Sequence, residues 1–296
     1  MRWLRTAVAA LFMSVTVGGG TAVAGQDDLF AYRRSAVEVR ELSVEHRDGV
    51  VVRDITYAGP GAVPVRAYLV EPERRGRYAA TLYLHWFEPG NPTQNRTEFL
   101  DEAVSMARRG MVALLPDLTF PWQDGPVGDQ TDRERVVRQV VQLRRGLDLV
   151  NSRPGVDPGR VAVVGHDYGG MYGLLLATAA DARRVRAAVA VNVDPTFSNW
   201  FAHFFLDLGG DATIRYEKLM EPVDPVRYVA RGVGGGLLYQ FSEPDFFVPD
   251  ATRRALVSVT AEPKTYRLYA GAPHELPGEP ARAERSTWLA GRLGLS

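Results

Sequence analysis

The chain has 296 residues, of which 46% are hydrophobic and 10% aromatic, so it can bury the core of one large domain and is neither disordered nor collagen-like. Thirty-five basic residues balance 35 acidic ones, and the chain therefore has no net charge that would attract nucleic acid or an anionic membrane. The absence of cysteine excludes disulfide bonds, a thiolate nucleophile and cysteine-ligated metal sites. Any chemistry would use oxygen or nitrogen side chains, or a cofactor.

The first 24 residues have the features of a secretory signal. Arg2 and Arg5 precede an apolar stretch over Ala7–Val17, and Ala22–Ala24 provides the small residues that a signal peptidase requires. We expect residues 1–24 to be removed on export, which leaves residues 25–296 in a secreted, periplasmic or extracellular protein. The alternative is a retained membrane anchor, which the short apolar run disfavours because a bilayer needs about 20 apolar residues.

Strands are predicted at two kinds of sequence. Three segments that mix apolar and polar residues, separated by glycine and proline, predict antiparallel strands at one sheet edge: Val37–Glu45, Val50–Tyr57 and Val65–Val70. Six later runs are short and mostly apolar: Ala79–Leu84, Met111–Leu115, Val161–Val164, Ala187–Val191, Leu237–Tyr239 and Thr265–Tyr269. Such runs fit strands covered on both faces, which requires intervening helices and a mostly parallel sheet.

The helices between these strands have recognisable end signals. Asn95 three residues before Glu98 predicts the start of a helix that Gly110 ends, and Thr131 with Glu134 predicts a capping box for the next helix. No internal repeat or linker divides the chain. The sequence therefore predicts one α/β domain.

The most informative segment joins a buried strand to a helix without a loop. The strand Arg160–Val164 is followed directly by Gly165–Gly170 (GHDYGG) and then by helix-forming residues. A turn this sharp strains its central residue, and glycines two positions before and after it avoid clashes. The pattern predicts a nucleophile elbow with Asp167 at an exposed tip, where the helix N-terminus favours an ionised carboxylate.

These motifs carry a family resemblance. Together with Asp157–Arg160 and Gly271–Leu276 (GAPHEL), the elbow makes the chain from about Val37 onward resemble the α/β-hydrolase superfamily, in a layout similar to dienelactone hydrolases. The resemblance implies a mostly parallel central sheet with antiparallel N-terminal edge strands, helices on both faces and a small helical lid at about 194–235. Relatives with this layout usually carry serine or cysteine at the elbow, whereas aspartate there looks like epoxide hydrolases and haloalkane dehalogenases.

The remaining catalytic groups are expected from the order nucleophile, acid, histidine. His274 follows the last predicted strand and is the candidate base, with a surface loop histidine as the structural alternative. Asp245 after the preceding strand is the preferred acid, and Asp194 is the second candidate; helix capping is the structural alternative for either.

An oxyanion hole needs two backbone N–H groups. One is expected from Tyr168 and the other from Trp86 or Phe87, whose bulk predicts a narrow pocket. No histidine pair has metal-site spacing, so we expect no metal and no cofactor, and we interpret four other histidines as structural. They are His46, His85, His166 and His203.

The lid contains aromatic residues at helical spacing, and their common face either packs on the domain or lines a substrate pocket. They are Phe197, Trp200, Phe201, Phe204 and Phe205. We assign Trp200, Phe201, Phe204 and Phe246 to the pocket and expect an apolar or aromatic substrate. The indole N–H groups of Trp200 and Trp86 are candidates for binding a halide, and Tyr216 and Tyr228 for protonating an epoxide oxygen.

The aspartate predicts the type of reaction. A carboxylate that attacks an ester carbonyl gives a mixed anhydride, whereas attack on saturated carbon gives a stable alkyl ester. We therefore predict a covalent aspartate hydrolase of an apolar epoxide or carbon–halogen compound, with a small organic substrate and with no nucleic acid or membrane partner once residues 1–24 are removed. The alternatives are an ester or lactone hydrolase in which Asp167 acts as a base, and a non-catalytic binding protein.

Overall fold

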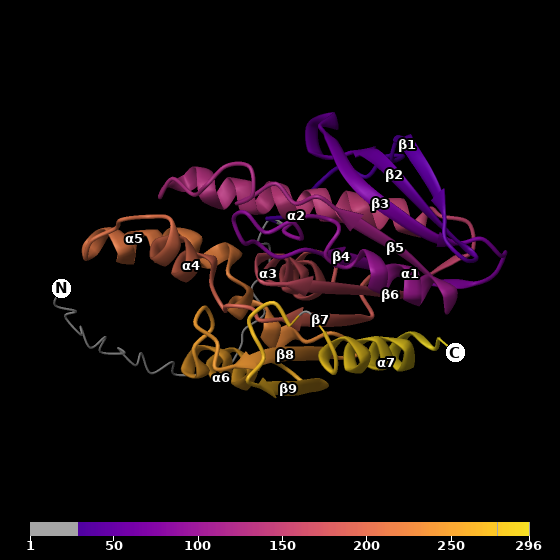
Figure 1. The fold of residues 1–296 in the computed structure, drawn as a ribbon. Helices are drawn as coiled ribbons and strands as arrows, with labels where there is room; N and C mark the ends of the chain where they lie inside the picture. Colours follow the sequence, from indigo (N-terminus) through magenta and orange to yellow (C-terminus); the bar gives the residue numbers. More distant parts are fainter. Residues whose placement is uncertain (1–28, 277, 296) are drawn as a thin grey trace.

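The computed structural model describes residues 29–276 and 278–295, so the expected signal sequence, residues 1–24, lies outside the described residues. One sheet of nine strands, in the order β1-β2-β3-β5-β4-β6-β7-β8-β9, runs through the molecule (Figure 1). The strands are β1 (Val39–His46), β2 (Val50–Ala58), β3 (Pro64–Pro72), β4 (Tyr78–Leu84), β5 (Met111–Pro116), β6 (Val156–His166), β7 (Ala187–Val191), β8 (Leu237–Glu243) and β9 (Lys264–Ala270).

The strand directions confirm the predicted sheet. β1, β2 and β3 pair antiparallel, and β3 joins β5 antiparallel. From β5 through β9 every neighbouring pair is parallel. Because parallel strands have their carboxyl ends at one edge, the loops after β4, β6, β7, β8 and β9 gather there.

Helices cover both faces of the sheet, and each side has its own apolar core. Side chains alternate along β4, so that Leu82 and Leu84 pack toward α2 and α3 while Tyr83 packs toward α1 and α7. The helices are α1 (Leu100–Arg108), α2 (Gln130–Asn151), α3 (Tyr168–Leu175), α4 (Phe197–Phe204), α5 (Asp211–Met220), α6 (Asp250–Val259) and α7 (Ala281–Leu293). Helices α4 and α5 and three short 3₁₀ turns fill the predicted lid region between β7 and β8.

Both predicted helix starts were placed wrongly. The Asn95 side chain accepts a hydrogen bond from the Thr97 N–H (2.9 Å), which closes a turn, and α1 begins only at Leu100. The cap of α2 is Asp129, whose carboxylate accepts from the Thr131 N–H (2.8 Å). In both places a side chain bonds the N–H two residues further on, and the sequence pattern does not distinguish this bond from a capping box.

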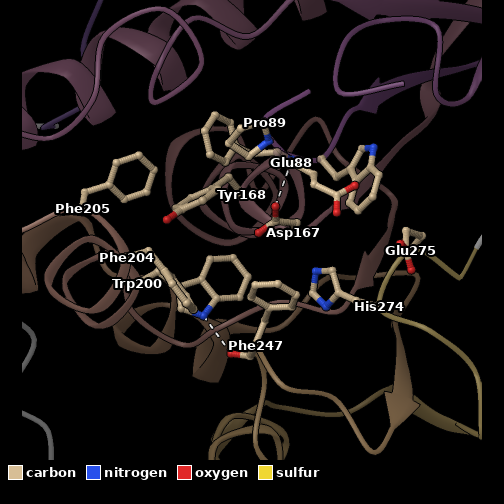
Figure 2. A pocket seen from close by; sticks show the side chains of 12 residues that line it. Glu88, Pro89, Asp167, Tyr168, Trp200, Phe204, Phe205, Phe247, His274 and Glu275 are labelled. Carbon is tan, nitrogen blue, oxygen red and sulfur yellow. Dashed lines mark hydrogen bonds between the residues drawn. The ribbon is translucent and has the colours of Figure 1, made fainter. Parts of the chain in front are cut away.

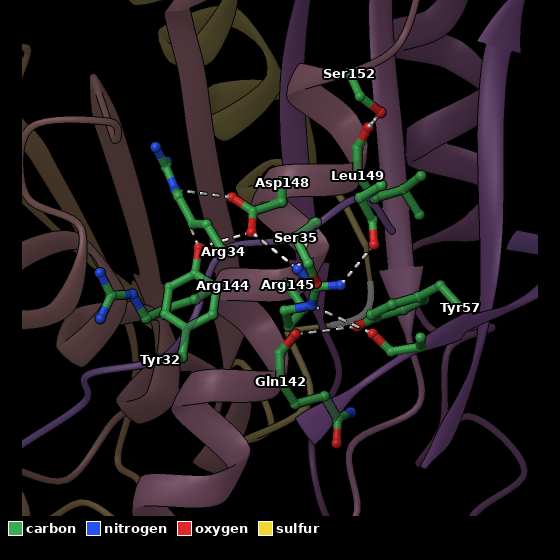
Figure 3. A network of polar contacts seen from close by, with 12 residues as sticks. Tyr32, Arg34, Ser35, Tyr57, Gln142, Arg144, Arg145, Asp148, Leu149 and Ser152 are labelled. Carbon is green, nitrogen blue, oxygen red and sulfur yellow. Dashed lines mark hydrogen bonds and ion pairs between the residues drawn. The ribbon is translucent and has the colours of Figure 1, made fainter. Parts of the chain in front are cut away.

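The segment before β1 is fastened to α2 by polar contacts (Figure 3). Arg145 donates to the carbonyl oxygens of Ser35 (2.7 Å) and Ala36 (3.1 Å), and the Tyr32 hydroxyl donates to Asp148 (2.7 Å). These bonds cross more than 100 residues of sequence and tie the segment to the domain. No helix in residues 29–276 and 278–295 is long and apolar enough to span a bilayer.

The connection from β6 to α3 is packed so closely that only glycine fits. A Cβ atom on Gly165 would clash with the backbone of Gly169, and one on Gly169 would clash with the backbone of Leu84 and His85 at the end of β4. Backbone neighbours in a central strand cannot move aside as a flexible side chain can. The two glycines therefore allow the elbow to lie against β4.

We predict that Gly169→Ala destabilises the protein by at least about 3 kcal/mol or prevents folding, because the new methyl group overlaps two carbonyl groups. Gly291→Ala in α7 is the matched control: nothing lies within 4 Å of its added Cβ, and helix propensity favours alanine by up to about 1 kcal/mol. Urea unfolding of the two variants measures the difference. Equal stability of both variants would contradict the packing described here.

Candidate active site

Asp167 lies at the junction of β6 and α3 in a strained backbone conformation, with φ 54° and ψ −127°. Its backbone N–H donates to the Val191 carbonyl at the end of β7 (2.9 Å), which fixes the turn against the neighbouring strand. The predicted exposure of this residue was wrong, because Asp167 is only 4% exposed. The lid and the loop after β4 cover it, so its carboxylate lies at the wall of a cavity.

The loop after β4 supplies one N–H group to that carboxylate. The Phe87 N–H donates to Asp167 Oδ2 at 2.9 Å (Figure 2). The Trp86 N–H instead donates to Glu98 Oε2 at 2.7 Å. Of the two predicted donors, Phe87 therefore faces the candidate nucleophile and Trp86 does not. The Tyr168 N–H, which is the other expected donor, lowers the pKa of the Asp167 carboxyl group.

His274 and Asp245, the predicted base and acid, are in contact. His274 Nδ1 lies 2.7 Å from Asp245 Oδ2, which leaves Nε2 available to the cavity. The Ser242 hydroxyl (2.9 Å) and the Phe247 N–H (2.8 Å) also donate to Asp245 and fix its carboxylate. Burial alone would raise the pKa of Asp245, but the hydrogen bond and charge of His274 outweigh it, so the pKa is lowered and the carboxylate stays ionised.

Asp194, the second candidate for the acid, has a different role. Its Oδ1 accepts from the Thr196 N–H (2.9 Å) and its Oδ2 from Asn199 Nδ2 (2.7 Å), at the start of α4. These bonds order the entry to the lid. Asp245, not Asp194, contacts His274.

The candidate nucleophile titrates near neutral pH. Burial raises the pKa of Asp167 to about 7, while the positive charge of His274 and the N–H groups of Phe87 and Tyr168 limit the rise. Groups shifted in this way occur often at catalytic centres, because a reactive group must change protonation state during turnover.

A cavity of about 290 Å³ opens between Asp167 and His274 (Figure 2). Its wall consists mainly of aromatic side chains, together with carboxylates and one proline. The lining residues are Trp86, Phe87, Glu88, Pro89, Asp167, Tyr168, Trp200, Phe204, Phe205, Phe247, His274 and Glu275. Two predicted pocket residues lie elsewhere: Phe201 is buried behind Tyr168 (ring centroids 5.6 Å apart), and Phe246 is 77% exposed, its place being taken by Phe247.

The predicted leaving-group donors are already hydrogen-bonded. Trp200 Nε1 donates to the Phe247 carbonyl (3.0 Å) and Trp86 Nε1 to Thr93 (3.1 Å), so neither is directed at a halide. The lid tyrosines are committed as well, because Tyr216 donates to Asp132 (2.7 Å) and Tyr228 to the Pro222 carbonyl (2.6 Å). Neither tyrosine lines the cavity.

A chain of buried hydrogen bonds, missed at the sequence level, connects these parts. Glu98 accepts from the Trp86 N–H and lies 2.8 Å from Nδ1 of His166, whose Nε2 lies 3.1 Å from the His274 carbonyl oxygen. Asn192 also donates to that carbonyl. Glu98 thereby links the loop that carries Phe87 to the loop that carries the base.

Asn192 extends the connection to the acid. Its Oδ1 accepts from the Ser242 N–H (2.9 Å), and the Ser242 hydroxyl donates to Asp245. No short sequence motif indicates this network, because its members lie on separate segments of the chain. Only the prediction that His166 has a structural role pointed toward the network. The other predicted structural histidines lie elsewhere. His85 Nε2 accepts a hydrogen bond from the Leu118 N–H (2.9 Å), and His46 and His203 do not line the cavity.

The bond geometry fixes the protonation of Glu98. A carbonyl oxygen only accepts, so His166 Nε2 must carry the hydrogen that faces His274. Burial lowers the pKa of His166 to about 3, so the ring is neutral and its Nδ1 is an acceptor. Glu98 must then donate, so it is protonated. Its pKa agrees with this: burial raises it from 4.5 to about 8 and outweighs the Trp86 N–H and the charges of Arg285 and His274, which lower it.

The site as a whole can form a covalent bond through Asp167, hold a developing oxyanion and transfer protons through His274. Among residues 29–276 and 278–295, no group of three or more potential ligands is arranged to hold a metal ion. The fold, the elbow and the arrangement of acid and histidine define an α/β-hydrolase.

Comparison with known families agrees with this assignment. Residues 83–290 match the alpha/beta hydrolase family, and the chain belongs to that family. Comparison with curated proteins gives no match.

Solved structures share the fold at low sequence identity. The chain is similar to an acetyl xylan esterase from Paenibacillus sp. R4, with 21% identity, a TM-score of 0.66, and coverage of 89% of this chain and 90% of that one. Acetyl xylan esterase 1 from Thermoanaerobacterium sp. JW/SL YS485 gives 17% identity, a TM-score of 0.68 and coverage of 86% and 87%. A cold-adapted esterase from an Arctic intertidal metagenomic library has 18% identity and a TM-score of 0.57, and the match covers 85% of this chain and 97% of that one.

We predict that Asp245→Asn lowers turnover by about 100-fold or more, because the imidazole loses the carboxylate that orients it and stabilises its positive charge. Asp194→Asn is the matched control, since Asp194 is also buried but bonds only the start of α4. Initial rates of both variants on one panel of epoxides and esters measure the effect. A larger loss in Asp194→Asn would contradict the assignment of the acid.

We predict that Glu98→Gln keeps most of the activity whereas Glu98→Leu loses it, because glutamine, like a protonated glutamate, accepts from Trp86 and donates to His166.

The stability of the Glu98→Gln variant supplies a second readout. Between pH 4.5 and about 8 the folded state keeps the proton of Glu98 while the unfolded state releases it. The contribution of Glu98 to the free energy of unfolding therefore falls as pH rises. Glu98→Gln should therefore gain stability over the wild type by a few kcal/mol at pH 8 and not at pH 4. A difference that is independent of pH would contradict a neutral Glu98.

Proposed function

We propose that this protein is a hydrolase in which Asp167 is a covalent nucleophile toward saturated carbon, with an apolar epoxide or carbon–halogen compound as its substrate. One observation carries the proposal: the Phe87 N–H already bonds Oδ2 of the nucleophile itself. In ester hydrolysis this N–H group would have to bind the substrate's carbonyl oxygen. In alkyl transfer to Asp167, Oδ2 becomes the carbonyl oxygen of the intermediate and is in place for the second step.

The first half-reaction starts from an ionised Asp167 and a protonated His274. Asp167 Oδ1 attacks the epoxide carbon, the carbon–oxygen bond breaks, and its electron pair moves to the ring oxygen. Imidazolium His274 gives that oxygen the proton from Nε2, which leaves an alkyl ester on Asp167 and a neutral imidazole. His274 takes this role because the lid tyrosines are directed away from the cavity.

The second half-reaction regenerates the enzyme. Neutral His274 removes a proton from water, whose oxygen adds to Cγ of Asp167 while the Phe87 N–H stabilises the charge on Oδ2. Collapse of this intermediate breaks the Cγ–Oδ1 bond, His274 protonates the leaving alkoxide, and a diol is released. The proton on the new carboxyl group returns to His274. Asp245 stabilises each imidazolium state through its bond to Nδ1.

An epoxide fits the site better than an alkyl halide. A departing halide needs hydrogen-bond donors, and the indole N–H groups of Trp200 and Trp86 are bound to protein acceptors. We further propose that the enzyme acts after export, on the basis of residues 1–24.

Ester or lactone hydrolysis is the second candidate. It is favoured by the fold similarity to proteins described as acetyl xylan esterases and by the pKa of Asp167 near 7, at which a carboxylate can act as a general base toward water. In this reaction no bond to Asp167 forms, so the two candidates differ in a covalent intermediate.

We predict that His274→Gln accumulates a covalent adduct on Asp167 and that Asp167→Asn lowers turnover by at least about a thousandfold. Ring opening is slowed in His274→Gln, but hydrolysis of the ester is blocked, so the adduct builds up. A panel of epoxides and alkyl bromides is incubated with each variant, and peptide mass spectrometry locates the added mass. The bromides need no proton donor and test the nucleophile alone.

The control is the double variant Asp167→Asn/His274→Gln, which should give no adduct with any compound. Absence of adduct in His274→Gln, together with wild-type ester hydrolysis that is lost in Asp167→Asn, would reject the covalent mechanism in favour of the second candidate. Binding of a small molecule without any turnover would instead support a non-catalytic protein.

A further inference from the structure

The cavity beside Asp167 carries an excess of negative charge. Two carboxylates besides the nucleophile line it, Glu88 and Glu275, and no lysine or arginine is among its lining residues. In the proposed mechanism the charges of an ionised Asp167 and a protonated His274 cancel, and those of the two glutamates remain. A substrate with a carboxylate or phosphate group would be repelled.

Neither glutamate is neutralised by the protein. In the described part of the chain, no ion pair involves Glu88 or Glu275, although 35 basic residues occur in the sequence. Glu88 is oriented by Asn91, whose Nδ2 donates to Oε2 (2.7 Å). Glu88, on the loop after β4, and Asp167 both line the cavity (Figure 2).

The opposite wall consists of aromatic rings. Trp200, Phe204, Phe205 and Phe247 line it, and the ring centroids of Phe204 and Phe247 lie 5.5 Å apart. The faces of aromatic rings attract cations, and a methylated ammonium group also gains from their apolar surface. An aromatic wall opposite an unpaired carboxylate is thus suited to an organic cation.

We propose that the substrate is an apolar compound with an organic ammonium group, whose cationic end lies between Glu88 and the aromatic wall while the reacting carbon faces Asp167. This inference rests on the proposed function for the reacting carbon, but the cation site itself can be tested without turnover. The positive charge would also favour the ionised form of Asp167, which is the nucleophilic form.

A pair of isosteric epoxides tests the inference in turnover. Glycidyltrimethylammonium and neopentyloxirane differ only in a positively charged nitrogen against a neutral carbon. We expect kcat/KM to favour the cation by about tenfold at low salt, since the carboxylates are partly exposed and their attraction is moderate. The preference should shrink as salt is added. Equal turnover of both compounds would overturn the inference and leave the covalent mechanism intact.

Binding separates the two proposals. Choline and its neutral isostere neohexyl alcohol are titrated against the wild-type protein, with quenching of tryptophan fluorescence as the signal. We expect choline to bind about tenfold more tightly. This result without turnover of either epoxide would support the cation site and reject the proposed function. No preference for choline would overturn the cation site.

A charge-matched pair of variants identifies the residue. Glu88→Gln keeps the acceptor for Asn91 but removes the charge, and Glu217→Gln removes the same charge from the exposed face of α5, outside the cavity. We expect the cation preference to fall several-fold in Glu88→Gln and to stay unchanged in Glu217→Gln. Equal changes in both variants would show a general charge effect and overturn the site.

Discussion

The site depends on the close contact between the end of β4 and the turn that joins β6 to α3. Gly169 brings this turn against the carbonyl groups of Leu84 and His85, and Asp167 takes its strained conformation there. The same contact brings the Phe87 N–H to 2.9 Å from the carboxylate, because Phe87 is the third residue after β4. One packing constraint therefore positions both the candidate nucleophile and the N–H group that is the candidate oxyanion donor.

A carboxylate at this position changes what the oxyanion hole holds. With a hydroxyl nucleophile the hole would be empty until a substrate carbonyl entered it, whereas here one oxygen of Asp167 occupies it in the free protein. The arrangement stabilises the ionised side chain in a buried place, where burial alone raises its pKa. In the proposed mechanism the same donor also stabilises the intermediate that water attacks, so the resting carboxylate and the second chemical step would use one N–H group.

Burial of polar groups extends around the whole site. Glu98, His166, Asn192 and Ser242 form a connected set of hydrogen bonds between the loops after β4, β7, β8 and β9. Such a network specifies one arrangement when every member is satisfied, since an unpaired buried group costs free energy. The network positions reactive groups that come from distant parts of the chain, and Glu98 does so as a neutral acid.

The sequence alone determined the features that depend on local pattern. Continuous apolar runs predicted the parallel strands, and the glycines around Asp167 predicted the elbow, because such a turn excludes other residues. Chain order predicted His274 and favoured Asp245. Helix starts at Asn95 and Thr131 were misplaced, because short polar side chains close turns as readily as they cap helices.

Only the tertiary structure decided which groups meet. It places Asp245 and not Asp194 against His274, directs the Phe87 N–H and not the Trp86 N–H to Asp167, places Phe247 and not Phe246 in the cavity, and shows that the lid tyrosines are hydrogen-bonded elsewhere. These choices depend on side-chain directions at the converging carboxyl ends of strands that are far apart in sequence. Periodicity predicts that a residue is buried, but a contact between two loops depends on how the whole sheet twists and packs.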